Sequence, residues 1–190
     1  MAYGEALQIC TALFGIICWR GAGDVIMHTR PVHLRLYDSK DAAFLSTVFF
    51  DAVRTAGLRD YSQAQVEAWA PAKPDPASVE ARARDGRLTL VAVNEVDEPI
   101  AYGDLEANGH IDHLFCRPEV IGTGVASTLY DRLEQEACER RMPRLFVEAS
   151  EAARRLFLRK GFAEIKRREF ILRGVPTHNY VMEKLLSGSG

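Results

Sequence analysis

Hydrophobic and polar residues alternate along this chain with two periods, one typical of strands and one typical of helices. Residues 32–37 alternate as a first strand, and Asp38 or Ser39 caps a helix that runs to about Gly57. The same reading, with turns marked by glycine and proline, predicts later strands at 88–94, 100–106, 109–116, 144–150, 163–172 and 178–186. The turn at Gly174 and Pro176 separates the last two strands.

Capping residues mark the starts of two further helices near the middle of the chain. Ser62 and Gln65 form a capping box, which predicts a helix that continues through Trp69. Asp75 followed by Pro76 starts a third, short helix that ends near residue 86. These signals are local, so each fixes one end of an element.

The segment from Gly109 to Phe162 carries the most informative pattern. An extended apolar run at 109–116 is followed by a turn at 117–121, by the loop residues Gly122, Thr123, Gly124, Val125 and Ala126, and by an amphipathic helix. Glycines let the backbone approach an anion closely, and the free amides and dipole at a helix start favour a phosphate there. The pattern therefore predicts a site for the phosphates of a nucleotide-type cofactor.

A second strand and helix follow this glycine loop. The strand at 144–150 ends in Ser150, a good N-cap, and Gly161 is placed to stop the short helix that follows. In its order of motifs the chain resembles the GNAT superfamily of acyl-CoA-dependent N-acetyltransferases, over residues 32–186. The signature of that family is Arg or Gln, two free positions, Gly, one free position, and Gly or Ala, after a strand and a proline-containing turn. Residues 121–126 (IGTGVA), after Pro118, occupy these places.

The resemblance implies an α/β (α+β) fold with a central mixed sheet, in which two parallel strands splay apart and helices flank the sheet. It implies acetyl-CoA as co-substrate, with the pantetheine arm paired to the backbone of Leu114 and Cys116 and the pyrophosphate held at 122–126. Ile121, Ser150 and Phe157 fall in the same cofactor site. Two of these residues depart from the family pattern, which has Arg or Gln in place of Ile121 and, in many members, a tyrosine in place of Phe157.

The reaction implied by the resemblance is transfer of an acetyl group from acetyl-CoA to a primary amine. An amine with a pKa of about 10.4 is a free base in only roughly one molecule in a few thousand at neutral pH, so a general base is needed. His110 and Asp112 share a strand face with the cofactor strand residues and are the first candidates. Glu148 is the next candidate, and Tyr180 is a further polar one, to assist the departing thiol.

The acceptor is a small-molecule or peptide amine, and residues 55–74, with Tyr61 and Trp69, are expected to wall its pocket. Two other classes of function stay open. One is a catalytically inactive acyl-CoA-binding sensor with the same fold. The other is an interaction module that uses the basic residues between Arg140 and Arg173.

Composition indicates one globular enzyme-sized domain, because 190 residues with 47% hydrophobic content can bury a full core. The net charge of −2 gives no general attraction to nucleic acid, and no segment reads as a membrane span. The four cysteines and five histidines show no metal-ligand spacing, so no metal is expected. Unpaired cysteines favour a cytoplasmic location, and Cys116 reads as a small buried residue rather than a nucleophile.

We expect an N-terminal extension at 1–31, non-native or disordered, ahead of an acetyltransferase-like domain at 32–187. Its apolar stretch at 6–19 is too short to span a bilayer, and Glu5 replaces the positive start of a secretory signal. The alternative is a genuine N-terminal helix that docks on the domain. The sequence leaves the oligomeric state open, a homodimer included.

Overall fold

The computed structural model describes residues 32–186, and the expectations for residues 1–31 lie outside the described residues. The N-terminal half has one strand followed by three helices, as the capping signals predict. Its elements are β1 (His33–Leu36), α1 (Ala42–Arg54), α2 (Gln63–Trp69) and α3 (Pro76–Ala83), with 3-10 turns at Ser39–Asp41 and Ala56–Arg59. None of the described helices is long and apolar enough to cross a membrane.

The C-terminal half alternates strands and helices in the expected order. Its elements are β2 (Leu88–Val93), β3 (Pro99–Leu105), β4 (Leu114–Cys116), α4 (Val125–Glu139), β5 (Arg144–Ala149), α5 (Glu151–Arg159), β6 (Ala163–Leu172) and β7 (Val175–Leu185). The predicted caps are confirmed. The Ser62 hydroxyl accepts from the Gln65 amide while the Gln65 side chain accepts from the Ser62 amide, and Ser150 caps α5 through the Ala153 amide.

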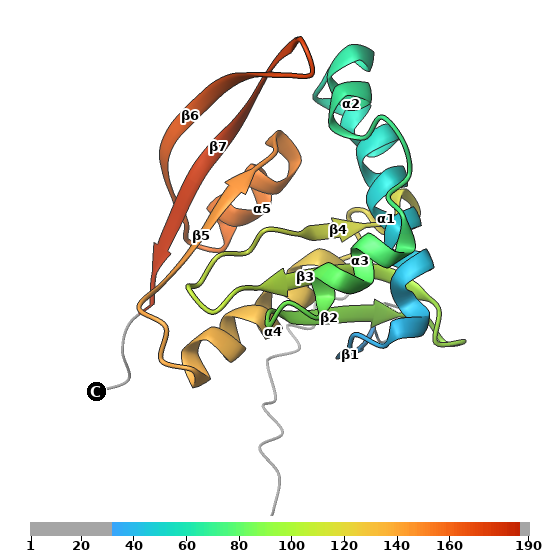
Figure 1. Cartoon of the computed structure of the whole chain (residues 1–190). Helices are drawn as coiled ribbons and strands as arrows, with labels where there is room; N and C mark the ends of the chain where they lie inside the picture. Colours follow the sequence, from blue (N-terminus) through green and yellow to red (C-terminus); the bar gives the residue numbers. More distant parts are fainter. Residues whose placement is uncertain (1–31, 187–190) are drawn as a thin grey trace, which may run out of the picture.

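The strands form two antiparallel sheets, in the orders β1-β2-β3-β4 and β5-β7-β6. The sheets meet at one parallel bridge between His110 and Phe146, where the Ile111 amide donates to the Phe146 carbonyl and the Phe146 amide to the Gly109 carbonyl, each over 3.0 Å. Beyond this bridge β4 and β5 diverge (Figure 1). The expected fold, a mixed sheet with splayed strands flanked by helices, is confirmed.

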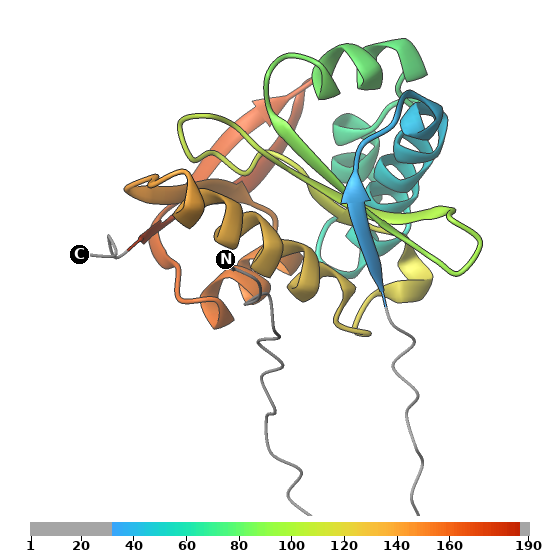
Figure 2. The ribbon, with the colours of Figure 1, turned by 90° about the horizontal axis from the view of Figure 1, so that it is seen from below.

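Helices cover both faces of the first sheet (Figure 2). α4 packs on the face that carries Leu90 and Leu105, and its residues Leu129 and Leu133 are fully buried there. α1 packs on the opposite face of the same sheet, against Val91, Val93 and Tyr102, through Leu45 and Val48. The alternation of buried residues along β2 and β3 thus fills two layers of core at once.

One predicted strand is shorter than expected, because a bulge interrupts the segment at 109–116. Two bonds to β3 frame the bulge: the Asp104 amide donates to the His113 carbonyl (3.0 Å) and the Glu106 amide to the His110 carbonyl (2.9 Å). The two bonds are two residues apart at Asp104 and Glu106 but three residues apart at His110 and His113, so the second segment contains one extra residue. Only Leu114–Cys116 remains a regular strand, and the extra residue lets the Ile111 amide turn toward β5.

The start of the last strand also differs from the prediction. β7 begins at Val175, and the turn before it consists of Arg173 and Gly174, both with positive φ (49° and 82°), as in a type I′ hairpin. Pro176 therefore lies within the strand rather than in the turn. It sits at the end of β7 that pairs with β6 alone, where a residue without an amide hydrogen is tolerated.

The bridge between the sheets gives a stability prediction at Gly109. This glycine has φ +90°, and a Cβ there would lie 2.2 Å from the Arg144 carbonyl oxygen. We expect Gly109→Ala to lose more than about 4 kcal/mol of unfolding free energy, or more than about 8 °C in Tm, because the clash adds to the strain of positive φ.

Gly86→Ala is the matched control, since Gly86 has φ +101° but open space around its Cβ position. Its expected loss is about 1–3 kcal/mol from backbone strain alone. Thermal unfolding of both variants compares the two. Equal losses would show that the close approach at the bridge contributes nothing to stability.

Candidate functional site

A cleft of about 760 Å³ opens where the two sheets diverge. Its walls come from β4 and β5, from the starts of α4 and α5, and from α1, α2 and the β6–β7 hairpin. Ten of the fourteen residues predicted for the site line this cleft: Asp112, Leu114, Cys116, Ile121, Gly122, Gly124, Ala126, Glu148, Ser150 and Phe157. His110, Thr123, Val125 and Tyr180 are not among its lining residues.

Strand register divides the cleft into two halves. On β5, Val147 and Ala149 face the core beneath α4 and α5, while Glu148 points to the other face, beside Val181 of β7. Thr177 and Asn179 of β7 lie on this second face and also line the cleft. One half of the cleft therefore borders the glycine turn and α5, and the other half borders α2 and the β6–β7 hairpin.

The backbone of β4 leaves polar groups free toward the gap. The His113 carbonyl and the Arg117 amide both bond to β3, so the backbone groups of Leu114 and Cys116 point to the other side by strand alternation. Strand β5 lies on that side, but it pairs with the segment before β4 at Phe146 alone. The free edge of β4, at Leu114 and Cys116, can therefore pair with an extended ligand.

The start of α4 is an exposed set of amides. Gly122 and Gly124 have φ values of +85° and +94°, and a Cβ at either position would meet nothing within 4 Å. No side chain caps this helix, whereas Ser62, Asp75 and Ser150 cap α2, α3 and α5. The first backbone bond of the helix runs from the Thr128 amide to Gly124, so the amides before it have no partner within the helix. An anion at the cleft would satisfy them.

The other residues predicted around this turn have structural contacts. Thr123 bonds back to the Val120 carbonyl through its hydroxyl (2.7 Å), and Val125 is buried in the core. Ile121 lies at the cleft with 41% of its surface exposed. An apolar side chain therefore stands where the family signature has the polar Arg or Gln. Phe157 borders the cleft but is 2% exposed and packs edge-on against Tyr130.

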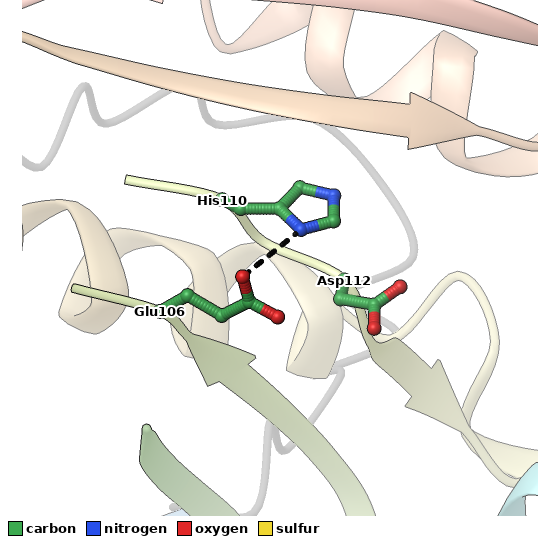
Figure 3. Close-up of side chains that lie close together, drawn as sticks. All are labelled: Glu106, His110 and Asp112. Carbon is green, nitrogen blue, oxygen red and sulfur yellow. Dashed lines mark ion pairs between the residues drawn. The ribbon is translucent and has the colours of Figure 1, made fainter. Parts of the chain in front are cut away.

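Glu148 and His110 form the polar pair nearest the bridge. His110 Nε2 lies 2.8 Å from Glu148 Oε2, its Nδ1 lies 3.5 Å from Glu106 Oε2, and its ring stacks on Phe146. Figure 3 shows Glu106 pointing toward the His110 ring, while Asp112 extends away from it. His110 therefore contacts Glu148, which lines the cleft, but does not line the cleft itself. The expected strand face shared by His110, Asp112, Leu114 and Cys116 does not exist, because the bulge breaks the alternation of the strand.

Asp112 lines the cleft but is committed to an arginine. It forms an ion pair with Arg82, and Arg87 lies 3.8 Å away. Burial raises the pKa of Asp112, but the hydrogen bond and charge of Arg82 outweigh it, so the net pKa lies below the ordinary value. A carboxylate with a lowered pKa is a weaker base, which counts against Asp112 as the group that deprotonates an amine.

The Glu106, His110 and Asp112 side chains lie close enough together to reach a single ion. Arg87 also pairs with Glu106 (3.2 Å), and Arg82 pairs with Asp112, so two guanidinium groups already balance these carboxylates. The arrangement is that of a salt-bridge network.

Tyr180 and Cys116 do not have the geometry of reactive groups in this cleft. The Tyr180 hydroxyl donates to Glu151, and this hydrogen bond, together with burial, raises the pKa of the phenol. Its side chain faces the core beneath α5. Burial raises the pKa of the Cys116 thiol to about 12, so it stays protonated at neutral pH, as expected for a buried structural cysteine.

Sequence reasoning missed a buried charged cluster behind the bulge and the polar groups of the β6–β7 hairpin. Asp104 is 1% exposed and accepts from the backbone amides of Asp112 and His113. Burial lowers the pKa of His113 to about 4, which leaves its ring neutral, beside the Tyr102 hydroxyl. An acidic residue in an otherwise apolar strand was the available signal, but its partners Arg82 and Arg87 become visible only in the fold.

A family model described as an acetyltransferase (GNAT) domain matches residues 57–184. The chain belongs to the GNAT acetyltransferase family. It is therefore an acyltransferase, and the resemblance read from the glycine turn is confirmed.

Relatives agree with this assignment across most of the chain. YafP of Escherichia coli strain K12, named as an uncharacterised N-acetyltransferase, is 28% identical over 151 residues, which cover 80% of this chain and 94% of YafP. The crystal structure of a GCN5-related N-acetyltransferase from Rhodopseudomonas palustris is 35% identical, covers 86% of this chain and 100% of that one, and has a TM-score of 0.76. The PaiA N-acetyltransferase of Thermoplasma acidophilum, solved with coenzyme A, shares the fold at 17% identity and a TM-score of 0.65, over 82% of this chain and 99% of that one.

Proposed function

We propose that this acyltransferase moves an acetyl group from acetyl-CoA to the primary amine of a small molecule or peptide, by direct attack of the amine. The observation that carries the proposal is the uncapped start of α4, which opens with two glycines onto the cleft. Structural neighbours hold coenzyme A or acetyl-CoA, among them PaiA and YncA of Salmonella typhimurium. The size of the cleft suits an extended ligand of this kind.

The residues present fit coenzyme A in three respects. The amides of Gly122 and of residues 124–126 are free for a pyrophosphate, while the Thr123 amide donates to the Val120 carbonyl, and the open Cβ positions of Gly122 and Gly124 leave room for the ligand. The free edge of β4, at Leu114 and Cys116, matches the amide groups of a pantetheine arm. Ser150 and Phe157 line the same half of the cleft, where Phe157 supplies an apolar wall.

When bound, acetyl-CoA supplies the thioester that an unprotonated amine attacks, with loss of the coenzyme A thiol. Glu148 is the residue placed to take the proton of the amine, because it lines the cleft where its two halves meet. His110 orients this carboxylate through its Nε2 and lies between Glu148 and Glu106. His110 is therefore a positioning residue, and Asp112, held by Arg82, lies in the same bulged segment.

The cytoplasm is the location that we infer for this enzyme. The described cysteines, Cys116 and Cys138, are both free, and Cys138 is exposed. Exposed unpaired thiols are typical of a reducing compartment.

The cofactor assignment predicts that Gly124→Asp abolishes binding of acetyl-CoA. The new side chain adds a negative charge and bulk where the amides face the cleft. Gly86→Asp is the matched control, because Gly86 also has positive φ and open surroundings but does not line the cleft. Calorimetric titration measures both. A folded Gly124→Asp protein that binds acetyl-CoA as tightly as the parent would refute the site.

The base assignment predicts that Glu148→Gln lowers kcat by about 10²-fold to 10⁴-fold, the usual cost of losing a general base. Binding of acetyl-CoA should be unchanged, and the deficit should shrink as rising pH deprotonates the amine. Asp112→Asn should cost less, because that carboxylate is paired with Arg82.

Glu183→Gln, on β7 and away from the cleft, is the control for the loss of a surface carboxylate. Full turnover by Glu148→Gln would place the base elsewhere. A parent protein that binds acetyl-CoA but acetylates no amine would instead be the acyl-CoA sensor that the sequence left open.

A further inference from the structure

Three arginines line the cleft without a carboxylate partner among the described residues: Arg159, Arg168 and Arg173. Arg173 is engaged with the backbone, since it donates to the Ala68 carbonyl over 2.6 Å and ties the hairpin turn to α2. Arg159 lies on α5, in the half of the cleft that borders the glycine turn. Arg168 is left in the other half, which the proposed cofactor site leaves open for the amine acceptor.

The Arg168 side chain is exposed to solvent, and two contacts orient it. Its Nε donates to Asn179 Oδ1 over 3.1 Å, and its guanidinium lies 5.3 Å from the centre of the Phe170 ring. No residue in the described part of the chain accepts from its two Nη groups. Asn179 is 2% exposed, and because its oxygen faces Arg168, its amide nitrogen is left as a donor.

A third polar group beside this pair lacks a partner. Thr177 is 4% exposed, lines the cleft, and its buried hydroxyl makes no hydrogen bond within residues 32–186. Leaving a buried hydroxyl unpaired costs free energy unless a ligand or water satisfies it. Thr177 lies two residues from Asn179 on β7 and so shares its face of the sheet. The three side chains form one polar patch, which offers donors and no free negative charge.

Strand register sets the position of this patch relative to the base. Arg168 pairs directly with Asn179, and Glu148 pairs with Val181, two residues further along β7. Glu148 and Asn179, on neighbouring strands, are therefore diagonal neighbours about 7–8 Å apart on one face of the sheet, and Arg168 lies on the same face one strand further from Glu148. An acceptor whose amine reaches Glu148 can therefore place a second group, a few bonds away, against Arg168 and Asn179.

Resting on the proposed acetyl transfer, we propose that the acceptor is an amino acid with a free amine and a free carboxylate, and that Arg168 and Asn179 bind that carboxylate. A planar carboxylate matches the paired donors of a guanidinium. Trp69 and Phe170, whose ring centres lie 6.0 Å apart, line the same half of the cleft and favour an apolar side chain on the substrate.

Matched substrates test the proposal. L-Phenylalanine and phenethylamine share an amine and a ring, but the second lacks the carboxylate, and L-leucine and 3-methylbutylamine form a second such pair. With acetyl-CoA and a free-thiol assay, we expect kcat/KM to be at least about tenfold higher for each amino acid, since only the amino acid offers a carboxylate to the Nη donors of Arg168 and to the buried amide of Asn179. Equal or faster turnover of the decarboxylated amines would overturn the proposal.

Variants of Arg168 assign the effect to the patch. Arg168→Gln should raise KM for L-phenylalanine at least about tenfold and leave phenethylamine unchanged, and Arg168→Lys should restore part of the loss. Arg167→Gln is the control, because Arg167 neighbours it on β6, points to the opposite face and pairs with Glu169. An Arg168→Gln protein that slows both substrates equally would contradict a carboxylate site.

Calorimetric titration of L-phenylalanine into the protein saturated with coenzyme A measures binding apart from transfer. Binding of L-phenylalanine that is lost in Arg168→Gln supports the carboxylate site. If no thiol is released in the same experiments, only the proposed acetyl transfer is contradicted. Thiol release from phenethylamine, with no binding of L-phenylalanine, would leave the transfer standing and overturn the carboxylate site.

Discussion

The buried carboxylate of Asp104 is the interaction on which the architecture of the site depends. It is 1% exposed, accepts from the backbone amides of Asp112 and His113, and pairs with Arg82 and Arg87 over 3.0 and 3.2 Å. The bulge after β3 has an extra residue whose amide cannot join the ladder, and Asp104 supplies the missing acceptor. Removing one partner from a buried, paired charge typically costs about 3–5 kcal/mol, so the bulge is firmly held.

Because the bulge turns the Ile111 amide toward Phe146, β4 and β5 are joined at one end alone and diverge beyond it. The divergence opens a cleft that extends from one face of the second sheet to the other. Glycine amides border one half, and the β6–β7 hairpin borders the other. Glu148 lies where they meet, with His110 behind it. A proton acceptor at this junction is what transfer between two ligands entering from opposite sides requires.

The parts of the fold predicted from sequence are those set by local signals. The capping box at Ser62, the Ser150 cap and the Gly161 stop each depend on atoms within a few residues. The bulge depends on Asp104, which lies eight residues before Asp112. The pattern at 109–116 is that of a regular strand, so it gives no sign of the bulge. The Arg168–Asn179 pair depends on the register of the hairpin, which the type I′ turn sets. Because Pro176 reads as part of the turn, the sequence does not predict this register. The sequence favours Asp112 over Glu148 as the base, because Arg82, the partner that pairs with Asp112, is remote in sequence.

The central claim is that the gap beside β4 and the amides at the start of α4 together hold one extended cofactor. Hydrogen–deuterium exchange of the individual backbone amides, with and without saturating acetyl-CoA, measures this directly. We expect slower exchange on binding at Cys116 and at 124–127, with little change at Phe115, whose backbone groups already pair with β3. Acetyl-CoA binding that leaves the exchange of Cys116 and of 124–127 unchanged would show that the cofactor does not lie along β4 and the start of α4.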